Sequence, residues 1–149
     1  MADLHFYHLT RRTLEQALPE LLEKTLARGW RAVVLAGSEE RAEQLTQHLW
    51  TYKPDGFLPH GNAKDGHADA QPIWLTARDE RPNGAAVLFL ADGAESALLD
   101  EYERVCDLFD GNDPDAVAAA RRRWKKAKDA GHTLTYWQQT DRGGWEKKA

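Results

Sequence analysis

The chain is poor in cysteine and has no long hydrophobic run. Cys106 is the only cysteine among 149 residues, so one chain can form neither a disulfide framework nor a thiolate metal cluster. No apolar stretch approaches the roughly 18 residues that span a bilayer, and the amino end lacks the basic-then-apolar layout of a signal peptide. We therefore expect a cytoplasmic protein in which Cys106, inside the apolar run 105–109, is a buried and inert thiol.

The motifs of nucleotide and nucleophile chemistry are also missing. Neither GxGxxG nor GxxxxGK[ST] occurs, and a phosphate cradle needs those glycines and that lysine. The glycine turns at 35–40 and 90–95 each carry acidic residues that would repel a phosphate. There is no GxSxG elbow for a nucleophile. We expect no intrinsic enzyme activity and no cofactor, with a nucleotide-dependent enzyme of degenerate phosphate loop as the weakest alternative.

Two polar clusters are weak candidates for metal binding. His60, His67 and Asp69 share one polar loop, which gives zinc no fixed geometry. Residues 110–115 contain three Asp and one Asn, but the order of acids and glycine does not match an EF-hand loop. A helix cap explains the second cluster better, and we predict no metal site.

Apolar periodicity predicts alternating strands and helices. The expected strands are 5–9, 32–36, 73–76, 85–91, 104–109 and 133–138, and the expected helices are about 11–28, 38–50, 94–100 and 114–130. Segment 51–71 is predicted to be mostly loop with at most one short strand. This alternation implies an α/β fold with a mainly parallel sheet and helices on both faces. At this length we expect one domain, residues 1–149, with a short basic and aromatic extension at about 140–149.

Segment 113–131 carries the strongest functional signal. Asp113 is a good N-cap, Pro114 suits the first helical position, and Gly131 supplies the left-handed residue that ends a helix. At about 100° per residue, the alanines share one face, which we expect to be buried. The neighbouring cationic face is made of Val117, Arg121, Trp124, Lys125 and Lys128.

Three functions are compatible with this cationic face. It could be a solvated surface beside a core tryptophan, or it could bind nucleic acid through the cations and aromatics of 121–128 together with Trp145. It could also hold an acidic peptide end, with Arg121 gripping a carboxylate and Val117 and Trp124 accepting an apolar side chain. With 20 basic and 24 acidic residues the net charge is −4, so a compact acidic ligand fits better than a long nucleic-acid backbone.

A second group of aromatic residues lies around the predicted end of the helix 38–50 and in the loop after it. Trp50, Tyr52 and Phe57 stand among two prolines, where a core needs fewer rings. Such residues are the usual anchors of protein interfaces. The alternative is that Trp50 and Phe57 plug the edge of the sheet.

Together these pieces resemble the chi subunit family of the bacterial DNA polymerase III holoenzyme. The resemblance is carried by Phe6-Tyr7-His8-Leu9, Leu49-Trp50, Phe57-Leu58-Pro59-His60, Phe109, Ala120-Arg121-Arg122-Arg123-Trp124-Lys125 and Ala130-Gly131. It implies a non-catalytic accessory protein of the clamp loader within the DNA-directed DNA polymerase complex. It also implies an α/β fold similar to nucleotide-binding domains but without their phosphate loop.

The resemblance further implies two partner surfaces. Chi family members bind the acidic, phenylalanine-ended tail of single-stranded DNA-binding protein, and many pair with a small subunit, psi, that ties them to the clamp loader. By resemblance the tail site consists of Val117, Arg121, Trp124, Lys125, Lys128 and Gly131. Arg121 and Lys125 would hold the carboxylates of the tail, and Val117 and Trp124 would line its apolar pocket.

The surface that faces psi would by similarity include Trp50, Phe57, Pro59 and His60, on the opposite side of the sheet. Psi is less widely recognisable than chi, so another clamp-loader or polymerase III subunit is the alternative partner. The extension Thr140 to Ala149 is longer than in the family pattern, which assigns it no role.

Overall fold

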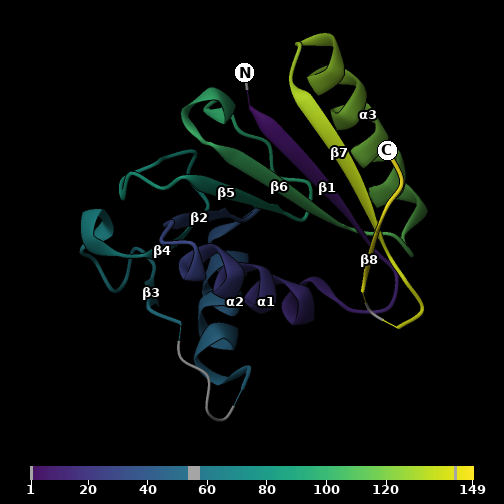
Figure 1. Cartoon of the computed structure of the whole chain (residues 1–149). Helices are drawn as coiled ribbons and strands as arrows, with labels where there is room; N and C mark the ends of the chain where they lie inside the picture. Colours follow the sequence, from purple (N-terminus) through teal and green to yellow (C-terminus); the bar gives the residue numbers. More distant parts are fainter. Residues whose placement is uncertain (1, 54–57, 143) are drawn as a thin grey trace.

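The computed structural model describes residues 2–53, 58–142 and 144–149. These residues include eight strands that form one sheet (Figure 1). The strands are β1 (Asp3–Leu9), β2 (Ala32–Leu35), β3 (His60–Gly61), β4 (Ile73–Thr76), β5 (Val87–Ala91), β6 (Arg104–Asp110), β7 (Thr133–Gln139) and β8 (Trp145–Lys147). Their order is β3-β4-β2-β5-β6-β1-β7-β8. The pairs are parallel apart from β7 with β8. The prediction of a mainly parallel α/β sheet is confirmed.

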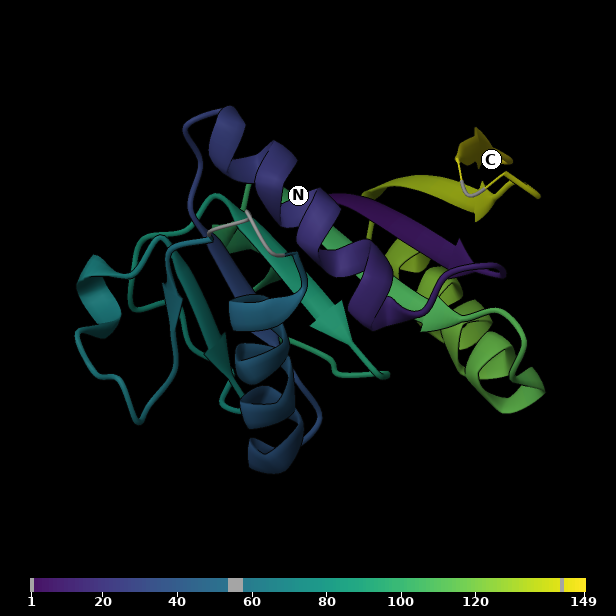
Figure 2. The ribbon, with the colours of Figure 1, turned by 90° about the horizontal axis from the view of Figure 1, so that it is seen from below.

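Helices cover both faces of the sheet, as predicted. They are α1 (Leu14–Ala27), α2 (Glu39–Thr51) and α3 (Pro114–Asp129), with short 3₁₀ turns η1 (Ala68–Ala70) and η2 (Leu99–Glu101). Figure 2 shows α1 and α2 in front of the sheet and α3 behind it. Leu18 and Leu45 of the first two helices share a buried cluster with Phe89, whereas Ala120 of α3 shares another with Leu88.

The central strands are buried on both faces. All residues of β2 and β5 are buried. Val34 and Phe89 belong to the cluster under α1 and α2, whereas Val33 and Leu88 belong to the cluster under α3. A strand covered on both sides needs apolar side chains at every position. The continuous apolar runs of the sequence therefore mark the centre of the sheet.

Helix α1 begins later than the predicted 11–28. The backbone N–H groups of residues 10, 11 and 12 donate to Oε1 of Gln139, at 2.9 to 3.1 Å. Thr13 is then the N-cap, in a capping box with Gln16. Because these three N–H groups find their acceptor at the end of β7, the chain turns around Gln139 before the helix starts.

The limits predicted for α3 are confirmed. The side chain of Asp113 accepts a hydrogen bond from the backbone N–H of Asp115 at 3.0 Å, and Pro114 is the first helical residue. Gly131 has φ of 88°, in the left-handed region that favours glycine. Local cap chemistry was sufficient to place both ends of this helix.

Two other expectations were incomplete or wrong. The helix predicted at 94–100 is absent, and only η2 forms there. The carboxylate of Asp79 accepts hydrogen bonds from the hydroxyl of Ser96 and the backbone N–H of Ala97, at 2.5 and 2.7 Å, which holds the segment in another conformation.

The predicted extension contains β8, which pairs antiparallel with β7. Segment 51–71 contains β3 and η1, as the prediction of mostly loop allowed.

The interior of the sheet contains Cys106. Cys106 is 3% exposed, and this burial raises the pKa of its thiol to about 12. The prediction of a buried thiol is confirmed. Among the helices in the ranges given above, none has the length and apolar character needed to cross a membrane.

Candidate functional site

Helix α3 presents its predicted cations to solvent. Arg121, Lys125 and Lys128 are exposed, whereas Val117 and Trp124 are half-buried against the core. Residues four apart on a helix are neighbours, so Val117, Arg121 and Lys125 form one row. The structure therefore brings together the predicted cations and the predicted apolar side chains on one side of α3.

The opposite side of α3 packs on the sheet, but fewer alanines are buried than expected. Ala120 and Ala127 are 2% and 6% exposed. Ala116 and Ala119 are half-buried, and Ala130 at the carboxyl end is exposed. The helix thus contacts the sheet closely only over its central two turns.

A buried ion pair, which the sequence analysis missed, ties α3 to the sheet. Nε and Nη2 of Arg123 donate to the two carboxylate oxygens of Asp107 on β6, at 2.7 and 3.0 Å. The side chains are 11% and 3% exposed. Burial raises the pKa of Asp107, and the charge of Arg123 opposes that rise. The three consecutive arginines therefore have different roles. Arg123 stabilises the fold, whereas Arg121 and Arg122 face solvent.

Trp124 rests on an aromatic cluster that comes from three neighbouring strands. Its ring meets Phe6 of β1 and Tyr136 of β7 edge to face, with centroids 5.3 and 5.7 Å apart. Tyr136 in turn contacts His8 and Phe109, and its hydroxyl lies 2.5 Å from Nδ1 of His8. Edge-to-face rings are a favoured aromatic arrangement. The cluster fixes Trp124 between the core and the row of cations.

Arg121 lies close enough to this cluster to change its electrostatics. Burial lowers the pKa of His8, and the positive charge of Arg121 lowers it further. Burial raises the pKa of Tyr136, while Arg121 acts in the opposite direction. His8 and Tyr136 are therefore neighbours of the candidate site that sequence reasoning did not identify. The quoted segment 6–9 held the signal, since His8 alternates with buried neighbours on a strand.

The three predicted cations, like Arg122, lack an ion-pair partner among the described residues, whereas the other two cations of α3 have one. Lys126 lies 4.0 Å from Glu95, and Arg123 pairs with Asp107. Within the described part of the chain, no carboxylate pairs with Arg121, Lys125 or Lys128. These charges are consequently available to an acidic ligand. Gly131, the remaining predicted member, lies at the exposed carboxyl end of the helix.

The second predicted surface lies on the other face of the sheet, at the end of α2. Trp50 is 47% exposed, and its ring centroid is 4.3 Å from that of His60. His60 is buried and its two ring nitrogens lie 2.5 and 3.0 Å from the carbonyl oxygens of Leu58 and Thr46. Pro59 is half-buried, and Phe57 lies outside the described residues. The exposed aromatic residue here is Trp50, and the buried His60 packs against its ring.

The carboxyl end of the parallel strands, where open α/β sheets bind nucleotides, carries equal numbers of acids and arginines. A cavity of about 300 Å³ there is lined by Glu15, Asp92 and Asp110 and by Arg11, Arg12 and Arg41. Arg11 pairs with Asp141 and Arg12 with Glu20. Arg41 pairs with Asp92 at 2.6 Å and also with Glu15, so its charge is already neutralised. In the ranges the structure describes, no three His, Cys, Asp or Glu side chains form a group that could hold a metal ion. This edge is poorly suited to a phosphate.

The fold and the site define an open α/β protein with an exposed basic helix on one face. Residues 1–135 match the family described as DNA polymerase III chi subunit, HolC. A protein named probable DNA polymerase III subunit chi, from Rickettsia prowazekii (strain Madrid E), is 32% identical over 109 residues. The alignment spans 73% of this chain and 66% of that protein, slightly under two thirds of its length. The chain belongs to the chi subunit family of DNA polymerase III.

Proposed function

We propose that the protein is a non-catalytic accessory subunit of the clamp loader in the bacterial replicative polymerase complex. In this role it binds the acidic carboxyl-terminal tail of single-stranded DNA-binding protein and links that protein to the polymerase machinery in the cytoplasm. The observation that carries the proposal is the row of unpaired cations on α3 beside a half-buried tryptophan. Membership of the chi family supports the setting in DNA replication.

The chemistry of α3 suits a peptide that ends in a bulky apolar residue. A guanidinium binds a terminal carboxylate through two parallel hydrogen bonds, which gives Arg121 the role of reading the end of the chain. Val117 and Trp124 offer apolar surface next to it for the last side chain. Lys125 and Lys128 add charge for acidic residues further back, with Gly131 at the rim.

The proposal includes a second partner on the opposite face of the sheet. Trp50, with Pro59 and the buried His60 behind it, would contact psi or another clamp-loader or polymerase III subunit, and Phe57 is assigned to the same surface. A large exposed indole is a common interface anchor. Since α3 and α2 lie on different faces, both partners could bind at once, with residues 1–149 acting as one domain.

Calorimetric titration with an acidic peptide ending in Pro-Phe tests the tail site. We expect micromolar binding of the free acid and none of the amidated peptide, because amidation removes the terminal charge. Arg121→Ala should weaken binding by roughly 2–4 kcal/mol, as expected when one member of a desolvated charge pair is lost. Arg122→Ala is the matched control, since Arg122 is an exposed arginine of the same helix. Equal binding of both peptides, or equal losses in both variants, would sink the site assignment.

A further inference from the structure

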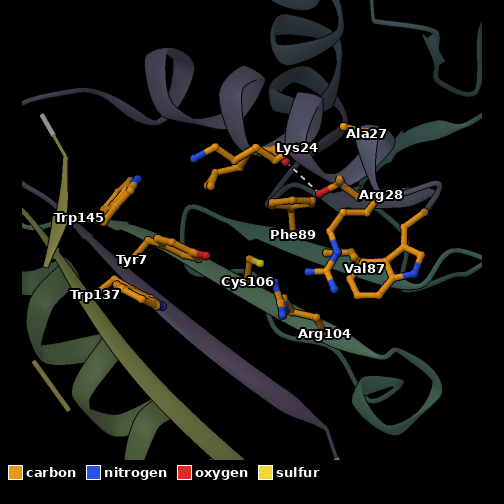
Figure 3. Close-up of a pocket in the computed structure, with 13 residues that line it drawn as sticks. Tyr7, Lys24, Ala27, Arg28, Val87, Phe89, Arg104, Cys106, Trp137 and Trp145 are labelled. Carbon is orange, nitrogen blue, oxygen red and sulfur yellow. Dashed lines mark hydrogen bonds between the residues drawn. The ribbon is translucent and has the colours of Figure 1, made fainter. Parts of the chain in front are cut away.

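A cavity of about 500 Å³ lies on the face of the sheet opposite α3 (Figure 3). It opens between the carboxyl-terminal half of α1 and the hairpin β7–β8. Its floor comes from β1, β5 and β6, including Tyr7, Phe89 and Cys106. We call this cavity the α1–hairpin pocket. Part of its wall, Trp137 and Trp145, lies beyond the residues 1–135 that match the chi family.

Aromatic rings line one side of the α1–hairpin pocket. Trp145 meets Tyr7 edge to face with centroids 5.0 Å apart, and Nε1 of Trp137 donates to Nδ1 of His5 at 2.9 Å. Figure 3 shows Tyr7, Trp137 and Trp145 together on one side of the cavity, with Arg28 on the other. Trp145 therefore packs back on the fold. It cannot share one binding surface with the cations of α3, as one sequence-based hypothesis required, because the sheet separates them.

Cations line the pocket without carboxylates. Lys24, Arg28 and Arg104 belong to its lining, and no Asp or Glu does so among the described residues. Nε of Arg104 is buried and makes no hydrogen bond within those residues, and its ion pair with Asp3, outside the lining, is long at 3.9 Å. The guanidinium of Arg28 lies 4.0 Å from the ring centroid of Trp30. In a chain of net charge −4, this lining is complementary to an anion.

The polar groups of the pocket distinguish between two kinds of anion. A peptide would need partners for its buried amide groups. The hydroxyl of Thr25 already donates to the carbonyl oxygen of Leu21 at 2.8 Å, and the indole N–H of Trp137 donates to His5. A nucleotide needs fewer hydrogen-bond partners from the pocket, because its base stacks through a π-face and its phosphate contacts cations. The lining therefore favours a nucleotide over a peptide.

We propose that the α1–hairpin pocket binds an unpaired nucleotide of a single-stranded nucleic acid. The base would lie among the rings of Tyr7, Trp137 and Trp145. The flanking phosphates would contact Arg28 and Arg104 at the other side of the cavity, and Lys24 would add charge from α1. Sequence-tolerant binding of this kind combines aromatic surfaces with a positive groove. This activity is separate from the tail site, because α3 lies on the other face of the sheet.

Fluorescence anisotropy of a labelled oligo(dT), titrated with the whole protein at low salt, tests the proposal without any partner protein. Arg28→Gln should weaken binding about fivefold and lower the slope of log affinity against log salt by about one, since one phosphate contact is lost. Trp145→Ala should weaken binding about tenfold through lost stacking. Arg28 is exposed, so its variant keeps the test valid even if the hairpin is disturbed by Trp145→Ala.

Arg122→Gln is the matched control, because it removes the same charge from the opposite face of the sheet, and it should bind oligo(dT) as the unaltered protein does. Absence of oligo(dT) binding at low salt would overturn the proposal. Equal losses of affinity in Arg122→Gln and Arg28→Gln would also overturn it, because the strand would then bind on α3 or through non-specific electrostatic attraction. If thymidine monophosphate bound as tightly as oligo(dT), the ligand of the pocket would be a free nucleotide and not a strand. Displacement by an acidic peptide whose own binding depends on Arg28 would assign the pocket to a peptide.

Discussion

The two faces of the sheet carry cations in different settings. On α3, Arg121, Lys125 and Lys128 stand on the surface of a helix beside the edge of one tryptophan. On the other face, Arg28 and Arg104 border a cavity that several aromatic rings line. A protruding row suits a flexible ligand with several charges, whereas a concave aromatic site suits a flat group that enters it. The same residue types therefore imply different ligands according to the shape around them.

The largest expected effect concerns what holds α3 in place. Arg123→Met should lower the free energy of unfolding by about 3–5 kcal/mol, because it leaves the buried carboxylate of Asp107 without its partner. Urea denaturation followed by circular dichroism measures this loss. Arg122→Met provides the control on the same helix, and we expect a change within about 0.5 kcal/mol for that exposed site. Similar stability of the two variants would show that the pair with Asp107 does not hold the α3 face.

A smaller loss of stability should follow from filling the space at Gly111, under the amino end of α3. A Cβ atom there would lie 1.9 Å from the ring of His8 and 2.6 Å from the carbonyl oxygen of Leu9. Gly111→Ala should therefore cost about 1–3 kcal/mol, as overpacking does, and should displace His8 from Tyr136. Thermal or urea unfolding measures the cost. Gly37→Ala is the control, since its Cβ would meet nothing within 4 Å; equal stability of both would contradict the close packing.

Local chemistry explains why some parts of the molecule could be predicted. The ends of α3 depend on Asp113, Pro114 and Gly131, which act within one turn of the helix. The central strands were predictable because burial on both faces requires uninterrupted apolar runs. The exposed cations of α3 followed from the helical period alone. Each of these features is determined by residues that are neighbours in the sequence.

The rest depends on residues far apart in the chain. The segment 94–100 has a helical composition, but the carboxylate of Asp79 accepts hydrogen bonds from Ser96 and Ala97 that hold the segment in another conformation. The strand β8 has no alternating pattern and forms through pairing with β7 and packing of Trp145 on Tyr7. Arg123 is different, because the period of about 100° per residue already places it among the alanines of the buried face. A single acid in the apolar run of β6 was the signal for its partner, Asp107.

The smallest expected effect tests whether the two faces act independently. A saturating concentration of the Pro-Phe peptide should change the affinity for oligo(dT) by less than about 0.5 kcal/mol, since distant sites without shared partners are usually additive. Any change should be a slight weakening, because the acidic peptide adds negative charge to the protein and salt screens that charge over distance. Anisotropy titrations with and without peptide measure it, and Arg121→Ala, which should not hold the peptide, is the control. Strong competition would mean that both ligands use one surface, and the division between the α3 row and the α1–hairpin pocket would be wrong.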